Sequence, residues 1–108
     1  MDWANTIRRC FESDRVLYSG HAKLEMETDE FGVVADSDVY EAICRGEAIK
    51  EYPDDAPYPS VLIFGTTSKG RPLHVVCAYN EEEDQVVIVT VYQPNPDRWV
   101  DYRRRRSE

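Results

Sequence analysis

The sequence has few cysteines, no long apolar run and a minority of basic residues, and each shortage excludes a class of protein. Its three cysteines, Cys10, Cys44 and Cys77, share no CxxC spacing and lie within apolar patterns, which argues against a disulfide framework and against a zinc site. No apolar run approaches the ~20 residues that span a bilayer, and residues 1–5 lack the basic and then apolar layout of a signal peptide. We expect a cytoplasmic protein without a membrane segment and without a cofactor.

Recognisable catalytic motifs are also missing. The sequence contains no glycine-rich dinucleotide loop, no phosphate-binding loop, no nucleophile elbow and no Cys–His arrangement. Glu81 to Asp84 are four consecutive acids, but carboxylates that alternate along a hairpin lack the spaced pattern of a calcium loop. We therefore expect no metal.

What is present is enough for one folded domain. The 108 residues are 42% apolar and 31% charged, and a chain of this size buries roughly two thirds of its unfolded surface. Residues 98–108 hold five arginines against Asp101 and Glu108, a net +3, so the total of −8 leaves −11 on residues 1–97. We expect a single domain over residues 1–100, a basic and flexible tail over residues 101–108, and a monomer or small homo-oligomer.

The first half of the chain has helical periodicity. Apolar residues recur at helical spacing over residues 3–11, with charged residues between them, which predicts an amphipathic helix. After an extended stretch at residues 15–18, Ser19 is placed to cap a short helix over residues 20–29. A third helix follows, with Ser37 as its expected N-cap.

In the second half of the chain, the residue pattern changes to the two-residue period of β-strands. Turn residues at Lys69-Gly70 and at 80–84 predict antiparallel hairpins. The fold class that follows is α+β, with the N-terminal helices packed on one face of a four-stranded, mainly antiparallel sheet. Its expected strands are residues 47–52, 60–66, 72–79 and 85–92.

The loop lengths also predict a register. A two-residue loop at Lys69-Gly70 puts Gly65 opposite His74, and a five-residue loop at 80–84 puts Thr90 opposite it. The expected face around His74 carries Val61, Ile63, Gly65, Val76, Ile88, Thr90 and Tyr92. The expected helix-packed face carries Leu73, Val75, Cys77, Tyr79, Val87, Val89 and Val91. A slip of one residue in either turn would exchange these faces for that strand.

Several motifs follow one another in a specific order. Ser19-Gly20-His21-Ala22 opens a helix, Met26 follows, and then come Gly46 to Pro53, Arg71 to Val76 and Thr90 to Pro94, with Trp99 beyond. In this order the chain resembles the domain-of-unknown-function family 4258 (DUF4258), over roughly residues 16–100. The resemblance implies the fold of RelE-like, barnase-like and BrnT-like ribonuclease toxins, and a zinc-finger antitoxin as partner. The family's helix motif carries an arginine four residues after the histidine, where this chain has Glu25.

Metal-independent RNA cleavage needs a base, an acid and cations for the charge on phosphorus. We expect His21, His74 and Tyr92 to be the catalytic residues, with the two imidazoles converging beside the phenol of Tyr92. The alternative is structural: His21 packs against Glu25 or caps its helix, His74 is a satisfied sheet residue, and Tyr92 is a core residue with a wet tip.

Basic residues near this face are the candidate substrate-binding residues: Lys69, Arg71, Arg98, Arg103 and Arg104. The run Arg103 to Arg106 could neutralise about four phosphates of an RNA strand. Otherwise the run folds back on acids such as Glu81 to Asp84, or stays solvated.

Two hypotheses of function result. The first, which depends mostly on the resemblance, is a toxin-type, metal-independent endoribonuclease that acts on RNA and is inhibited by a protein antitoxin. The second is a non-catalytic protein-binding module of the same fold, which the net charge of −8 and Glu25 favour.

Overall fold

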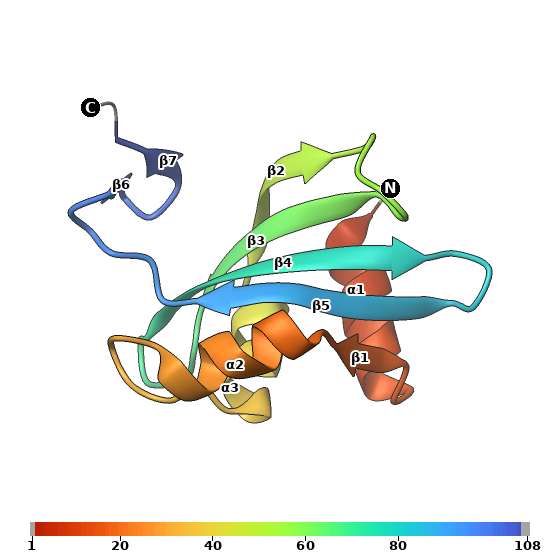
Figure 1. Ribbon diagram of the computed structural model, residues 1–108, viewed down its shortest axis with the longest axis horizontal. Coiled ribbons are helices and arrows are strands. Elements are labelled where there is room, and N and C mark those ends of the chain that lie inside the picture. The colour runs from red at the N-terminus through yellow and green to blue at the C-terminus, as the bar shows by residue number, and fades with distance from the viewer. Residues whose placement is uncertain (1, 107–108) are drawn as a thin grey trace.

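The structure is a computed structural model that describes residues 2–106. Within this range, three helices pack against one face of a five-stranded sheet, and a separate two-stranded sheet stands at the C-terminal end (Figure 1). The helices are α1 (Trp3–Glu12), α2 (Gly20–Thr28) and α3 (Asp36–Cys44). The strands are β1 (Val16–Tyr18), β2 (Glu47–Tyr52), β3 (Ser60–Thr66), β4 (Pro72–Asn80), β5 (Gln85–Tyr92), β6 (Trp99–Val100) and β7 (Arg104–Arg105).

The main sheet is mixed, so the predicted four-stranded, mainly antiparallel sheet is wrong. Its strand order is β1-β5-β4-β3-β2, and β1 runs parallel to β5, with Val16 beside Val86 and Tyr18 beside Ile88. The stretch at residues 15–18 was expected to be extended, but three residues carry no alternation that assigns them to a sheet. Their partner is distant in the sequence, and only the folded chain brings the two segments together.

The helices begin where local hydrogen bonds favour it. Ser19 is the N-cap of α2, as predicted, because its hydroxyl accepts from the Ala22 amide at 3.0 Å. The prediction of Ser37 as the cap of α3 is wrong. Ala35 holds that position in an extended conformation, and its amide donates to the Asp38 carboxylate at 2.9 Å.

The turn between β3 and β4 is one residue longer than the expected two-residue loop. The Thr67 amide donates to the Arg71 carbonyl at 2.9 Å, and Gly70 has a positive φ of 81°, as in hairpins with a three-residue loop. The register therefore slips by one residue: His74 lies opposite Phe64, and Gly65 lies opposite Leu73.

The pairing of β4 with β5 differs as well. A four-residue turn joins Asn80 to Gln85, and an irregularity between Val76 and Cys77 shifts the register further along. His74 is thus opposite Tyr92, where the sequence predicted Thr90. A bulge of this kind has no sequence signal here, because both strands alternate regularly on either side of it.

These slips exchange faces, as a one-residue shift must. On β3, the face that packs against the helices carries Val61, Ile63 and Gly65, which were expected on the face of His74. On β5, Ile88 also lies on the helix-packed face, and Val87, which pairs with Ala78, lies on the face of His74. The assignments within β4 are confirmed. The buried core between sheet and helices includes Ile7, Ala22, Val39, Ile43, Val61, Ile63, Leu73, Val75, Cys77, Val86, Ile88 and Val91.

The basic end of the chain folds over the other face of the sheet. Strands β6 and β7 form an antiparallel hairpin in which Trp99 pairs with Arg105 and Val100 with Arg104. Its turn residues Asp101 and Tyr102 both have positive φ, 52° and 60°, which matches the right-handed twist of a tight hairpin. Residues 101–106, expected to be a flexible tail outside the domain, thus lie in this hairpin; residues 107–108 lie outside the described range.

Candidate functional site

His21 lies in the first turn of α2 and faces solvent. Its Nε2 is 3.2 Å from Oε1 of Glu25, and its side chain is 66% exposed. The same Glu25 oxygen accepts a hydrogen bond from the Val91 amide at 3.1 Å. The structural alternative for His21, packing against Glu25 one turn along the helix, is therefore the arrangement found.

His74 lies on the sheet face that is turned away from the helices, and it is completely buried. Its Nδ1 is 3.0 Å from the Tyr92 hydroxyl and its Nε2 is 2.5 Å from the Tyr102 carbonyl oxygen. Burial lowers the pKa of His74, against a smaller opposite effect of the Tyr102 carbonyl. The predicted convergence of His21 and His74 is wrong, because α2 and the hairpin lie on different sides of the sheet.

Aromatic rings enclose the His74 imidazole. The rings of Phe64, Tyr92 and Trp99 have their centroids 5.9, 5.2 and 4.4 Å from it, all in edge-on geometry. Burial raises the pKa of Tyr92 to about 12, with a smaller contribution from Tyr52 in the same direction. The structure thus joins His74 with Tyr92, as expected, but in the interior of an aromatic cluster.

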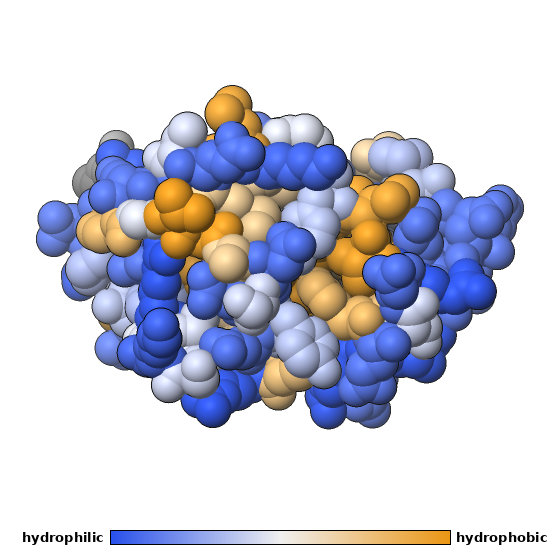
Figure 2. Space-filling model, turned by 90° about the horizontal axis from the view of Figure 1, so that it is seen from below, coloured by the Kyte–Doolittle hydropathy of each residue, from blue (hydrophilic) through white to orange (hydrophobic). Residues whose placement is uncertain are grey.

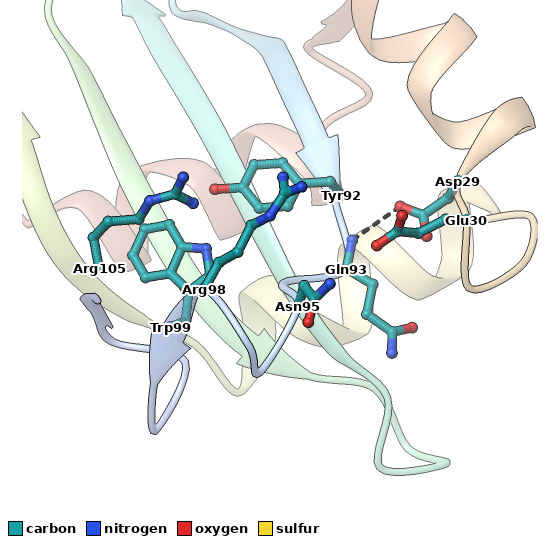
Figure 3. A pocket seen from close by; sticks show the side chains of 8 residues that line it. All are labelled: Asp29, Glu30, Tyr92, Gln93, Asn95, Arg98, Trp99 and Arg105. Atoms are coloured by element: carbon teal, nitrogen blue, oxygen red, sulfur yellow. Dashed lines mark hydrogen bonds between the residues drawn. The ribbon is translucent and has the colours of Figure 1, made fainter. Parts of the chain in front are cut away.

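A cavity of about 310 Å³ lies beside this cluster, between the end of β5 and the C-terminal hairpin. Figure 3 shows Trp99 and Arg105 on one side, with the hydroxyl end of Tyr92 directed toward them, and the Arg98 side chain crossing the Tyr92 ring in this view. Asp29 and Glu30 lie on the opposite side. The residues that line the cavity are Asp29, Glu30, Tyr92, Gln93, Asn95, Arg98, Trp99 and Arg105.

The two sides of the cavity differ in whether their charged side chains already bind partners within the protein. The carboxylate of Asp29 accepts from the amides of Gln93 at 3.0 Å and Phe31 at 2.9 Å, and it lies 3.6 Å from the Arg71 guanidinium. Arg98 and Arg105 form no ion pair with any carboxylate within residues 2–106. Their positive charges are available to a ligand in the cavity.

Two predicted substrate-binding residues lie elsewhere. Lys69 is exposed in the β3–β4 turn. Arg71 joins two segments of the chain. It donates to the Gln93 side chain at 2.6 Å and to the carbonyls of Val33 and Gly32 at 2.8 and 2.6 Å. Neither residue lines the cavity.

Of the arginines at the end of the chain, Arg98, a predicted substrate-binding residue, lines the cavity. Arg103 is hydrogen-bonded to Glu47 and its guanidinium lies 4.9 Å from the Phe64 ring centre, and Arg104 is exposed in β7. Sequence reasoning missed Arg105, whose guanidinium lies 5.7 Å from the Trp99 ring centre. The two-residue alternation of a short strand could have pointed to Arg105. The run of arginines was instead expected to be flexible.

Apolar side chains also reach the surface on the helical side of the molecule. Leu24, Phe31 and Val33, on α2 and the loop after it, are 59, 44 and 68% exposed. Figure 2 shows apolar areas set among hydrophilic side chains on this side. Because Arg71 binds the carbonyls of Gly32 and Val33, the loop that carries two of these side chains is held in place.

Two features are absent from the described residues. Residues 2–106 contain no group of three or more histidine, cysteine, aspartate or glutamate side chains that could hold a metal ion. No helix among them has the length and the apolar character needed to cross a membrane.

Comparison with known proteins gave one match. The sequence model of a family described as a domain of unknown function (DUF4258) matches residues 18–93. No curated protein and no solved structure matches the chain. The match includes Asp29, Tyr92 and Gln93 of the cavity, whereas Arg98, Trp99 and Arg105 lie beyond it.

Proposed function

The chain belongs to the DUF4258 family, and from the chemistry of its cavity we propose that it binds single-stranded RNA there and cleaves it without a metal ion, as a toxin-type endoribonuclease. Inhibition by a protein antitoxin is part of this proposal. The substrate is proposed from the cavity, and the toxin-type activity from the family resemblance.

One observation carries the choice of ligand: two guanidiniums that form no ion pair within residues 2–106, and two aromatic rings, line the same cavity. Arg98 and Arg105 are suited to phosphate oxygens, and Trp99 and Tyr92 offer ring surface beside them. Proteins bind single-stranded nucleic acids by combining cations for the backbone with aromatic rings on which bases stack. Glu30 on the facing side opposes a phosphate, so we expect the strand to lie against the hairpin side.

The cavity supports the electrostatic part of RNA cleavage. In that reaction the 2′-hydroxyl loses its proton to water and its oxygen attacks phosphorus, the bond to the 5′-oxygen breaks and that oxygen takes a proton from water, and negative charge builds up on the phosphoryl oxygens. Arg98 and Arg105 would stabilise this charge. No free imidazole lies in the cavity, since His21 is on α2 and both ring nitrogens of His74 are engaged. An acid or base contributes roughly 10²–10⁴ in rate, so we expect a slow enzyme.

The test is RNA cleavage by the purified chain at low salt with EDTA. We expect wild type to cleave a single-stranded RNA, and the Arg98→Gln, Arg105→Gln double variant to lose most of this activity. Arg45→Gln is the matched control, because Arg45 is exposed at the end of α3, away from the cavity. Induced expression of wild type, but not of the double variant, should arrest growth. RNA left intact by wild type would refute the enzymatic proposal.

The second candidate, a non-catalytic protein-binding module, is favoured by the exposed Leu24, Phe31 and Val33. Residues 1–97 carry a net charge of −11, so the partner that fits has apolar side chains framed by basic residues. We expect such a partner to co-purify in a fixed ratio with wild type and to be lost with the Phe31→Ser, Val33→Ser double variant. RNA cleavage unaffected by this variant, with no partner in a native pull-down, would count against the module.

A further inference from the structure

The hydrogen bonds of His74 determine which way the Tyr92 hydroxyl donates. The Tyr102 carbonyl oxygen, 2.5 Å from Nε2, can only accept, so Nε2 carries a proton. Burial keeps the ring neutral, which leaves Nδ1 as an acceptor. The Tyr92 hydroxyl, 3.0 Å from Nδ1, therefore donates its single proton to His74.

The oxygen of Tyr92 is left with lone pairs only. Tyr92 lines the cavity together with Arg98, and its hydroxyl end is directed toward Trp99 and Arg105 (Figure 3). On this side, the cavity thus presents guanidinium donors together with one phenolic acceptor. A ligand that satisfies both must bring an acceptor group and a hydroxyl or amine donor within a short distance of each other.

We propose that Tyr92 accepts a hydrogen bond from a ribose 2′-hydroxyl, and that the pocket selects RNA over DNA by this contact. In RNA each 2′-hydroxyl lies next to a phosphate, so one nucleotide offers the donor to Tyr92 and the acceptors to Arg98 and Arg105. DNA offers the phosphate alone and brings no donor to the lone pairs of the Tyr92 oxygen. His74 and Tyr102 are positioning residues, because they fix the direction of the Tyr92 proton. The inference depends on the proposed binding of single-stranded nucleic acid in this cavity.

The experiment compares three oligonucleotides of one sequence: RNA, 2′-O-methyl RNA and DNA. Binding is followed by fluorescence anisotropy in a stopped-flow instrument with EDTA, before any cleavage. The methylated strand keeps the RNA sugar conformation but has no 2′ donor, so it separates the hydrogen bond from the shape of the strand. We expect wild type to bind RNA about three- to tenfold more tightly than either of the other two, the range for one hydrogen bond.

Tyr92→Phe removes the oxygen and keeps the ring. We expect Tyr92→Phe to bind RNA as weakly as wild type binds the 2′-O-methyl RNA. Its affinity for DNA should equal that of wild type. Tyr40→Phe on α3 is the control, and it should retain the preference of wild type. Because the comparison of the three ligands on wild type needs no substitution, the inference can be tested even if Tyr92→Phe folds poorly.

Two results would overturn the inference and leave RNA binding in place. One is equal affinity of wild type for all three strands. The other is an equal loss of RNA and DNA binding in Tyr92→Phe, which would show that the hydroxyl supports the cavity through its hydrogen bond to His74 and does not read the 2′-hydroxyl. A wild-type protein that binds none of the strands at low salt would refute the proposed function as well.

Discussion

At the scale of single residues, the environment of each histidine decides its chemistry. His21 is exposed and its ring is 3.2 Å from a carboxylate oxygen of Glu25, while His74 is buried and donates to a main-chain carbonyl. A sequence shows two imidazoles of equal intrinsic basicity, and burial then makes the neutral form of one of them the stable form. His74 therefore serves the site by orienting Tyr92.

The lowered pKa of His74 predicts how stability depends on pH. In the unfolded chain the imidazole gains a proton near pH ~6.5, whereas in the folded chain it stays neutral to lower pH. Between these two pKa values the unfolded state binds more protons, so the free energy of unfolding falls as the pH drops below ~6.5. At pH values below the pKa of His74 in the folded chain, and above ~6.5, both states bind the same number of protons at His74. There His74 adds nothing to the slope of the free energy of unfolding against pH.

Urea denaturation between pH 7.5 and pH 5 measures this effect. We expect the acid slope of wild type to persist in His21→Gln, which removes the other imidazole of the chain. It should be reduced in His74→Gln, whatever the absolute stability of that variant. An unchanged slope in His74→Gln would show that His74 titrates equally in both states.

At the scale of elements, side chains at and just after α2 bind the part of the β5 edge that β1 leaves unpaired. β1 pairs with β5 only as far as Ile88. Beyond it, Glu25 accepts from the Val91 amide and Asp29 from the Gln93 amide, at 3.1 and 3.0 Å. Carboxylates thus take the place of a neighbouring strand and satisfy donors at an exposed edge. This gives Glu25 a structural role at the edge of the sheet.

This arrangement predicts a large effect of Asp29→Ala. The substitution removes the acceptor for two amides, those of Gln93 and Phe31, and hydrogen bonds to a charged group contribute about 1.5–3 kcal/mol each. We expect the free energy of unfolding, measured by urea denaturation, to fall by about 3 kcal/mol or more because both bonds are lost. Glu27→Ala, an exposed site on the same helix, should change it by less than about 0.5 kcal/mol. Equal effects of the two would contradict the proposed role of Asp29.

The contact of α3 with β3 depends on a glycine. A Cβ atom at Gly65 would lie 1.8 Å from the Ala42 carbonyl oxygen, a main-chain atom that cannot rotate away. We expect Gly65→Ala to destabilise the protein by about 3 kcal/mol or more in thermal or urea unfolding. Gly20→Ala is the matched control, because nothing lies within 4 Å of its Cβ position and the residue begins α2. It should be neutral or stabilising by about 0.5 kcal/mol.

At the scale of the whole molecule, charge is separated by sign. Residues 1–97 carry −11 and the last eleven residues carry +3, and the hairpin holds most of these arginines on the sheet face away from the helices. A polyanion is therefore attracted to one end of an otherwise acidic protein. The same separation keeps the helical side acidic around its exposed apolar side chains.

This separation predicts the salt dependence of RNA binding. Each phosphate contact on a single strand contributes about 0.7 to the slope of log affinity against log salt. We expect the Arg98→Gln, Arg105→Gln double variant to have a slope smaller by about 1.4 than that of wild type, measured by anisotropy between 50 and 200 mM salt. Arg45→Gln should leave the slope unchanged. An unaltered slope in the double variant would place the RNA elsewhere.

The family resemblance was recognisable from the sequence because it depends on the order of local motifs, and the family match confirms it over residues 18–93. The helix and strand ranges, the cap at Ser19 and the inward face of β4 were predictable for a similar reason: periodicity and capping act over a few neighbouring residues. These interactions need no knowledge of the rest of the fold.

Only the tertiary structure decided the partner of β1, the neighbours of His74 and the position of the arginine-rich end. The register depends on one residue in each of two turns and on one bulge, and each changes which side chains meet across the sheet. The hairpin forms because Trp99 and Tyr102 cover an aromatic face built by β3, β4 and β5. Contacts between segments so far apart in the sequence leave no local pattern, and the candidate site is made of such contacts.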